Sequence, residues 1–501
     1  MKPLYLILPL VSCGISAMAQ QHPNIILIMS DQHRGDAMSC VMPNFAITPN
    51  LDSLAHDGTL FTSAYTSCPS STPARATLLT GLSPWHNGML GYGRLARHYR
   101  YEGPKMLHEA GYYTYAIGKN HWYPQRGLRG LDGVLLDESG RVEDENFVSD
   151  YRNWFNLMQP GVSPDKTGLG WNDHVAKVYE FSDTLHPTFW TGKMASEFIS
   201  HYNLSKPLFL KVSFARPHSP YDPPRKFLNQ YKDRDMPNRY IGDWCTPWEK
   251  KLDPSKASSS APRGNFGEEY AKHSKLFYCA NVTFVDEQIG EIIKTLKNRN
   301  LYDNSLIIYL SDHGDQLGDH YHWRKTYPFE GSTHIPFIVK WPKSVEEQQK
   351  IPSRSSQVVE LCDVLPTFLE TAGDTVPHDM DGRSLYAVLS KNSVKSWRKY
   401  LVMEHSRCYG EADDWVGITN GKQKYVYYFY DGRELFFDLE KDPHELHNAV
   451  EDKAYAKRLS SLKAALVSSL TERGDDFVKS GNLVVRKKRI LYSPNYPDKN
   501  P

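Results

Sequence analysis

Short, continuous apolar runs recur along the first three quarters of the chain and end abruptly at polar residues. The run at 24–30 (NIILIMS) stops at Asp31 and Gln32. A run of this length with no polar interruption is typical of a strand buried on both faces of a parallel sheet. The same pattern predicts further strands at 112–117, 207–215, 305–310 and 336–341.

Longer stretches with helical periodicity separate these runs. They predict helices at 48–54, 104–110, 188–203, 268–297 and 359–372. Strands that alternate with helices indicate an α/β fold, in which a large, mostly parallel sheet is sandwiched between helices.

The pattern changes after about residue 395. We expect a strand at 400–404, a hairpin formed by 425–430 and 434–439, and a helix at 453–471. Asp431-Gly432 suits a type I′ turn between the two hairpin strands. This region reads as a smaller α+β subdomain with an antiparallel sheet. We therefore divide the chain into a larger domain, 20–390, and a C-terminal subdomain, 391–501.

The N-terminus predicts a signal peptide over residues 1–19. Lys2 precedes an apolar run at 4–11, and Ala17-Met18-Ala19 forms a small-residue cleavage site. The run is too short to span a bilayer. Residues 10–13 also resemble a lipoprotein cleavage box, so lipidation at Cys13 is the alternative to cleavage after Ala19.

Charge and cysteine content narrow the class of protein. With 59 Lys and Arg against 58 Asp and Glu, the chain lacks the broad basic surface of a nucleic-acid or anionic-membrane binder. Export implies an oxidising compartment. The six cysteines beyond residue 19 are scattered, with no Cys-x-x-Cys pair, so neither a zinc knuckle nor a dense disulfide framework is indicated; one or two disulfides stay open.

Acidic and polar residues follow two of the predicted strands. Asp31 and Gln32 follow the strand at 24–30, and Asp312 and His313 follow the strand at 305–310. Ligands of open α/β sheets bind beyond the carboxyl ends of the strands. Because three of these four side chains offer a hard oxygen, the set favours Ca²⁺ or Mg²⁺ over Zn²⁺. A lone Asp in this place is often just a turn residue, but two such pairs indicate a metal site.

The segment 71–81 (STPARATLLTG) predicts a helix with an anion site at its start. Pro73 suits the first helical turn, and Gly81 is a natural stop. Ser71 would lie just before the helix N-terminus, where free N–H groups favour an anion. Arg75 could donate two hydrogen bonds to a tetrahedral oxyanion. The plain alternative is a serine-capped structural helix.

Together these segments resemble the type I sulfatases, a formylglycine-dependent family with the alkaline-phosphatase-like fold. Ser71-x-Pro73-x-Arg75 is similar to its signature, which begins with Cys or Ser. The other matching segments are Pro23-Asn24-Ile25 through Asp31-Gln32, Gly118-Lys119-Asn120-His121, Arg216-Pro217-His218-Ser219-Pro220, Ser311-Asp312-His313-Gly314 with Gly318-Asp319-His320 and Lys325, and Trp341-Pro342. Further similarity at Phe437-Asp438-Leu439, Asp442-Pro443, Glu445 and Asn448 extends the resemblance over nearly all of the mature chain.

The resemblance implies a sulfuric ester hydrolase and a role for each matching residue. Ser71 would be oxidised to formylglycine, whose hydrated aldehyde is the nucleophile. The implied metal ligands are Asp31, Gln32, Ser71, Asp312 and His313, with Ca²⁺ as the ion and Mg²⁺ as the alternative. Arg75, Lys119 and Lys325 would neutralise the sulfate oxygens. His218 would protonate the leaving alcohol, and His121 would act as the base that releases sulfate.

A serine at this position also bears on maturation, habitat and substrate. By family analogy, the serine type requires an oxygen-independent maturation enzyme, which indicates an anaerobic bacterium and a periplasmic location. Glycosaminoglycan or mucin-type oligosaccharides lead as substrates. The candidate substrate contacts are Arg97, His98, Trp122, Arg216, His322, Arg324, His334, Glu404 and Arg407.

Two other functions stay open: a phosphoester or phosphonate hydrolase on the same fold, and a non-catalytic glycan-binding relative. A zinc phosphatase would need a second set of His and Asp ligands, which the sequence does not provide.

Overall fold

The computed structural model describes residues 22–245, 249–389 and 395–498. The expected signal peptide, with Cys13, and the expected boundary between residues 390 and 391 lie outside these ranges. No helix within them is long and apolar enough to cross a membrane.

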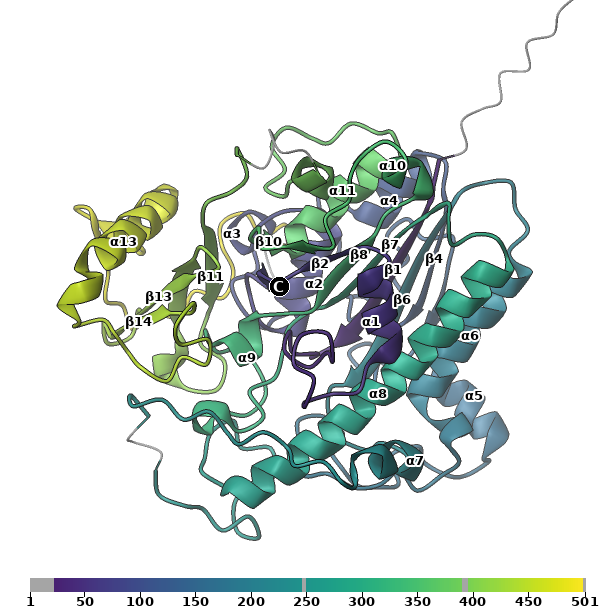
Figure 1. Cartoon of the computed structure of the whole chain (residues 1–501), viewed down its shortest axis with the longest axis horizontal. Helices are drawn as coiled ribbons and strands as arrows, with labels where there is room; N and C mark the ends of the chain where they lie inside the picture. Colours follow the sequence, from purple (N-terminus) through teal and green to yellow (C-terminus); the bar gives the residue numbers. More distant parts are fainter. Residues whose placement is uncertain (1–21, 246–248, 390–394, 499–501) are drawn as a thin grey trace, which may run out of the picture.

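An eight-stranded sheet forms the centre of the molecule (Figure 1). In spatial order its strands are β5 (Gly133–Leu136), β4 (Tyr113–Gly118), β6 (Leu208–Pro217), β1 (Asn24–Asp31), β7 (Ser305–Ser311), β8 (Phe337–Lys340), β2 (Thr59–Phe61) and β9 (Arg354–Ser355). The strands from β5 to β7 are parallel, whereas β8 is antiparallel to both of its neighbours. The predicted α/β class with a mostly parallel sheet is confirmed.

Helices cover both faces of the sheet, which explains why β1 is buried at every position. Ile26 and Ile28 pack against the layer of α1 (Pro49–His56), α6 (Pro187–His201) and α8 (Glu268–Asn298). Ile25, Leu27 and Met29 point to the other layer, formed by α2 (Ser71–Thr80), α4 (Gly103–Glu109) and α11 (Val364–Thr371). Side chains of a strand alternate between faces, so each layer is packed against half of them.

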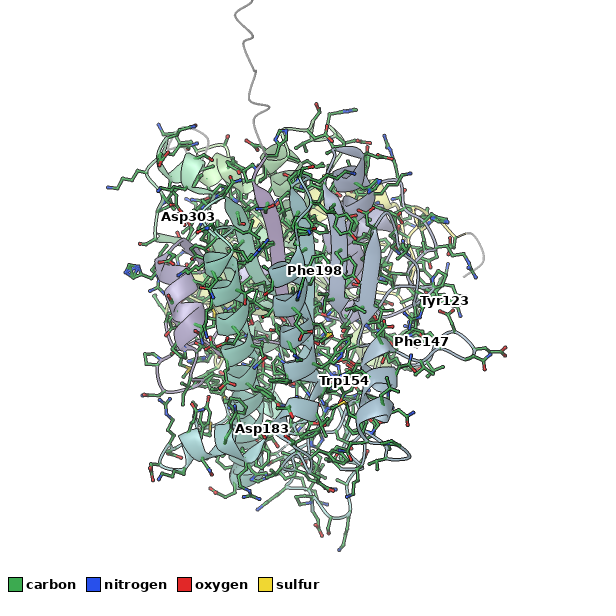
Figure 2. The ribbon with its side chains drawn as sticks, turned by 90° about the vertical axis from the view of Figure 1, so that its right-hand side faces the viewer. Tyr123, Phe147, Trp154, Asp183, Phe198 and Asp303 are labelled. Carbon is green, nitrogen blue, oxygen red and sulfur yellow. The ribbon has the colours of Figure 1, made fainter. Side chains whose placement is uncertain are left out.

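Figure 2 views the face that carries α6 and α8. Phe198 of α6 lies over the sheet there, with its ring centroid 4.4 Å from that of Tyr115 on β4. Trp154 belongs to α5 (Asp150–Met158), at the border of the same layer. This layer buries the apolar core on the side away from α2.

A second sheet follows in the chain, as the sequence predicts. Its antiparallel strands are, in order, β11 (Leu401–His405), β12 (Trp415–Thr419), β13 (Gln423–Tyr428) and β14 (Glu434–Asp438). The helix α13 (Ala456–Leu470) packs on one face through Leu462, Leu466 and Leu470. The opposite face packs against Tyr327 and Phe329 of the large domain. The remaining short elements are β3 (Ala64–Tyr65), α3 (Pro84–Asn87), α7 (Arg225–Leu228), α9 (Glu330–Thr333), α10 (Lys343–Glu346), β10 (Val359–Glu360), β15 (Val478–Lys479) and β16 (Asn482–Leu483).

Two local predictions are wrong. The helix expected at 359–372 begins at Val364, because Val359 and Glu360 pair with β3 and a capping box between Glu360 and Asp363 starts a 3₁₀ turn. The turn at Asp431-Gly432 is not type I′, which needs a positive φ at both central residues. Gly432 has φ 75°, Asp431 is not among the positive-φ residues, and the register pairs Tyr427 with Glu434, so the loop is longer.

Candidate active site

The site lies where four neighbouring strands end. β4, β6, β1 and β7 are adjacent, and Lys119, His218, Asp31 and Asp312 stand at or just beyond their carboxyl ends. Sequence spacing separates these segments widely, but sheet order brings them to one edge. Gly118 allows the turn after β4: its φ is 95°, and a Cβ atom there would lie 2.1 Å from the carbonyl oxygen of Ser213.

Ser71 is brought to this edge by α2. Ser70 is the N-cap residue and Ser71 is the first helical residue, so the sequence expectation was off by one position. Gly81 ends the helix in a left-handed conformation, as predicted. Ser71 is buried, and its Oγ lies 3.1 Å from Nε2 of His313.

Asp31, Asp312 and His313 form a cluster whose ligand atoms lie within 4.8 Å of one another. Nδ1 of His313 donates to the carbonyl oxygen of Gly314 at 3.0 Å, so Nε2 presents its lone pair to the cluster. Oδ1 of Asp31 is buried without a hydrogen-bond partner among the described residues. Converging lone pairs that lack a proton between them repel one another unless a cation lies there, so these residues fit a divalent metal ion.

Arg75 and Lys119 hold the cluster from behind. Nε and Nη2 of Arg75 donate to Oδ2 of Asp312 and of Asp31, at 3.0 and 3.2 Å, and Lys119 also contacts Oδ2 of Asp31. Burial raises the pKa of Asp31, but Lys119, His218 and Arg75 outweigh it and hold that pKa well below its usual value. Asp31 therefore stays ionised, and the Oδ1 atoms of Asp31 and Asp312 lie 3.8 and 3.7 Å from Nε2 of His313.

Gln32 adjoins the cluster in a left-handed conformation, with φ 70°. Its side-chain Nε2 donates to Asp315, and its Oε1 accepts a 2.7 Å hydrogen bond from Nζ of Lys325. Asp315 is thus a residue that sequence reasoning missed, although it directly follows the Ser-Asp-His-Gly motif. A carboxylate there fixes which atom of Gln32 faces the site.

His218 and Lys325 form a buried pair. Nδ1 of His218 donates to the carbonyl oxygen of Ser219 at 3.0 Å, so its Nε2 accepts from Nζ of Lys325 at 2.6 Å. Burial lowers the pKa of Lys325 to about 7, and burial together with Lys325 lowers the pKa of His218 well below its usual value. The pair therefore holds a proton that is easily released.

His121 is positioned through its backbone. Its N–H donates to Oε1 of Glu138 at 2.9 Å, and its φ is 55°. Both ring nitrogens are buried without a hydrogen-bond partner among the described residues. Burial, followed by the charges of Arg141 and Lys119, lowers its pKa well below the usual value. The imidazole is consequently neutral and has a free lone pair.

A pocket of about 210 Å³ opens above Ser71. It is lined by Ser70, Ser71, Tyr92, Arg141, Trp171, Asn172, Lys325, Thr326, Cys408 and Tyr409. Apart from Ser71 and Lys325, sequence reasoning missed these residues. They lie in irregular loops, which carry no periodic signal.

Within the described residues, none of the nine predicted substrate contacts lines this pocket. Arg324 comes near, with its guanidinium 4.3 Å from the ring centroid of Tyr409. Arg216 instead forms paired 2.8 Å hydrogen bonds with Asp222, and Glu404 pairs with Arg473. The others contact different parts of the molecule: Trp122 is in the core, His322 packs on Tyr327, His334 packs on Tyr65, Arg97 lies over Tyr123, His98 is exposed, and Arg407 lies near Glu411.

The cysteines in the described ranges, Cys40, Cys68, Cys245, Cys279, Cys362 and Cys408, are all free. Five of them are buried or half-buried, and Cys408 is exposed. The disulfides left open by the sequence do not form among these residues.

The fold and the strand-end cluster define a hydrolase of the alkaline-phosphatase-like class. The family model described as Sulfatase matches residues 23–374, and the model described as N-sulphoglucosamine sulphohydrolase, C-terminal, matches residues 318–472. The chain is 34% identical to an arylsulfatase of Clostridium perfringens, over 92% of this chain and 97% of that protein. It belongs to the sulfatase family and is a sulfuric ester hydrolase.

Two further comparisons widen this picture. An N-acetylglucosamine-6-O-sulfatase of Bacteroides thetaiotaomicron is 27% identical over 95% of this chain and 92% of its own length. The crystal structure of a phosphonate monoester hydrolase of Agrobacterium radiobacter superposes with a TM-score of 0.74 at 24% identity, covering 93% of this chain and 99% of that one. The likeness to the phosphonate monoester hydrolase shows a shared fold.

Proposed function

We propose that this sulfatase removes sulfate esters from carbohydrates of the glycosaminoglycan or mucin type. The reaction would use formylglycine at position 71 and a bound divalent cation. The contact between Ser71 Oγ and His313 Nε2, at the edge of the carboxylate cluster, carries the proposal. An N-acetylglucosamine-6-O-sulfatase among the relatives supports a sugar substrate.

Asp31, Gln32, Asp312, His313 and the oxygen of residue 71 would hold the cation, with Ca²⁺ proposed and Mg²⁺ as the alternative. Such an ion supplies Lewis acidity, which lowers the pKa of a coordinated hydroxyl and offsets negative charge on a bound ester. A formylglycine at position 71 would supply a hydrated aldehyde in place of the weakly nucleophilic serine hydroxyl.

The chain's own residues would move the protons. The His218–Lys325 pair would donate its proton to the alcohol oxygen as the S–O bond breaks, because the low pKa of Lys325 makes the proton available. Neutral His121 would accept a proton from the second hydroxyl of residue 71 when sulfate is released. Arg75 and Lys119 would oppose the negative charge that develops on the sulfate oxygens, and Lys325 would do so until its proton is transferred.

We also propose export to the periplasm after cleavage at Ala19, with lipidation of Cys13 as the alternative. Maturation would require an oxygen-independent formylglycine-generating enzyme. The division of the chain into 20–390 and 391–501 remains part of this proposal.

The mass of the peptide that contains residue 71 tests the mechanism. The protein is produced anaerobically with and without a maturation enzyme. We expect a loss of two hydrogens and aldehyde reactivity only with the maturation enzyme, together with sulfate release from sulfated oligosaccharides. The variant Ser71→Ala should lose both the modification and the activity, whereas Ser70→Ala should keep the modification.

Unmodified Ser71 in active protein would contradict the formylglycine mechanism. The alternative function, a phosphoester or phosphonate hydrolase, is tested by comparing the rates at which the protein hydrolyses the sulfate ester and the phosphate ester of the same alcohol. Faster turnover of the phosphate ester would favour that alternative, which the structural likeness to the phosphonate monoester hydrolase keeps relevant.

A further inference from the structure

Arg141 is a charged residue of the pocket above Ser71, and one nitrogen of its guanidinium has no hydrogen-bond partner among the described residues. Arg141 follows β5 in a loop, and this nitrogen, Nη1, is buried. A buried guanidinium nitrogen that remains unpaired costs free energy, because water is lost and nothing replaces it. An anionic ligand group in the pocket would satisfy it.

Arg141 lines the same pocket as Ser71 and Lys325. Burial, followed by the charge of Arg141, lowers the pKa of Lys119 and of His121, and the charge of Arg141 is a smaller cause of the lowered pKa of His218 and of Lys325. Arg75 and Lys119 already bind the carboxylates of Asp31 and Asp312, and Lys325 is bound to His218 and Gln32. Arg141 thus adds a positive charge that the cluster does not neutralise.

Nearby acids do not supply a hydrogen bond to its Nη1 either. Both oxygens of Glu138 accept backbone N–H groups of the segment 120–121. Oε1 of Glu143 lies 3.6 Å from Nε2 of His121, and its side chain is 32% exposed. Neither carboxylate is hydrogen-bonded to the Nη1 of Arg141.

The rest of the pocket wall suits a sugar ring. Tyr92, Trp171 and Tyr409 present aromatic rings, and Asn172 presents an amide that can both donate and accept hydrogen bonds. The guanidinium of Arg324 lies 4.3 Å from the ring centroid of Tyr409, at a cation–π distance. The volume of about 210 Å³ limits the bound group to about one sugar residue with its substituents.

We infer that Arg141 binds a second anionic group of the substrate, a carboxylate or a second sulfate, beside the sulfate that is cleaved. The preferred substrate is then a doubly anionic saccharide whose terminal residue fills this pocket. The inference rests on the proposed carbohydrate substrate and assigns Arg141 as a specificity-determining residue.

The test compares Arg141→Gln and Arg141→Lys with the wild-type matured enzyme. Four substrates are used: 4-nitrophenyl sulfate, a monosulfated amino sugar, and two doubly anionic sugars that carry either a second sulfate or a linked uronate. We expect Arg141→Gln to raise KM about tenfold or more for a doubly anionic sugar, because a charge-assisted pair is lost, and to change the other two substrates less than about twofold. Arg141→Lys should retain part of the preference.

The two doubly anionic sugars distinguish a carboxylate from a sulfate as the second group. Arg100→Gln is the matched control, since Arg100 is an exposed arginine paired with Asp379 and should alter none of the values. An equal loss on all substrates would overturn the inference, because Arg141 would then bind the cleaved sulfate itself. Unchanged kinetics on all substrates would overturn it as well.

Sugar binding to the Ser71→Ala variant tests this inference independently of the proposed mechanism. Calorimetry with that variant measures recognition without turnover. Tighter binding of the doubly anionic sugar, lost on adding Arg141→Gln, would support the pocket assignment even if residue 71 proved to be unmodified. Equal binding of singly and doubly anionic sugars would contradict it even if formylglycine were found.

Discussion

At the scale of single residues, the free oxygen of Asp31 defines the site. Arg75 and Lys119 occupy the Oδ2 atom of Asp31, and its Oδ1 has no partner among the described residues. A carboxamide at position 31 would therefore remove a charged ligand from a cation, and it would also remove the charge that Arg75 and Lys119 pair with. The sequence predicted the identity of these ligands, but not the hydrogen bonds that orient them.

The first prediction concerns metal binding by Asp31. We expect Ca²⁺ to raise the Tm of the wild-type protein in a concentration-dependent manner. At about 100 times Kd the free energy of unfolding should rise by about 2.7 kcal/mol. Asp31→Asn should weaken Kd at least about tenfold, because one charged ligand is lost. The metal is first removed with a chelator and Ca²⁺ is then titrated back. The Tm at each Ca²⁺ concentration gives the stabilisation and the Kd of each protein. Asp379→Asn, an exposed acid outside the site, should bind as the wild type does; no effect of either ion on the Tm of the wild type would refute the assignment.

At the scale of elements, loop contacts decide how helices and strands are joined around the site. α3 is tied to the segment after α11 by His86, whose Nδ1 lies 2.8 Å from both oxygens of Asp381. Its Nε2 lies 3.4 Å from Oε2 of Glu472, next to the C-terminal end of α13. One histidine thus joins three segments that are distant in the sequence, a connection that no periodicity predicts.

The second prediction is a pH-dependent contribution of His86. The hydrogen bond to Asp381 raises its pKa above 6.5. A raised folded-state pKa means that the stabilisation is fully present below pH 6.5 and is lost as the pH rises through the folded-state value. His86→Gln should cost less than about 1 kcal/mol at pH 5.5, since the side chains are partly exposed, and almost nothing at pH 9. Urea unfolding at the two pH values measures the difference; a larger loss at the higher pH would contradict this account.

Sequence reasoning predicted most elements of the large sheet and its helices, because a buried strand must be apolar throughout and ends where polar residues begin. It failed where long-range pairing overrides the local pattern. Val359 and Glu360 look helical in isolation, yet they pair with β3. The strand β12 was missed because Trp415–Thr419 is a short run without turn signals of its own, and its neighbours β11 and β13 define it.

At the scale of the whole molecule, the C-terminal sheet supports the loop that carries Lys325. Nε1 of Trp415 on β12 donates to the carbonyl oxygen of Thr326 at 2.8 Å, directly after Lys325. Lys424 on β13 donates to the carbonyl oxygen of Pro328 at 2.9 Å and to Glu445 at 2.8 Å. The loop that carries Lys325 is therefore fixed by a second sheet, rather than by its own conformation.

The third prediction tests this support with a matched pair of tryptophans. Trp415→Phe removes the donor to Thr326, and Trp397→Phe removes a donor to the carbonyl oxygen of Val358, also at 2.8 Å. We expect both to cost about 1–3 kcal/mol of stability, because each leaves a carbonyl unpaired. Trp415→Phe alone should reduce kcat/KM, about tenfold, since it releases the loop beside Lys325. Equal activity of the two variants would show that the loop does not need this contact.

The sequence by itself determined the fold class, the strand-end carboxylates and the helix that presents Ser71, because burial periodicity and residue chemistry are local properties. Only the tertiary structure decided the pocket above Ser71. Tyr92, Arg141, Trp171 and Tyr409 come from separate loops. Loop conformations depend on long-range packing rather than on a repeating pattern, so no local signal marked these four residues as pocket residues.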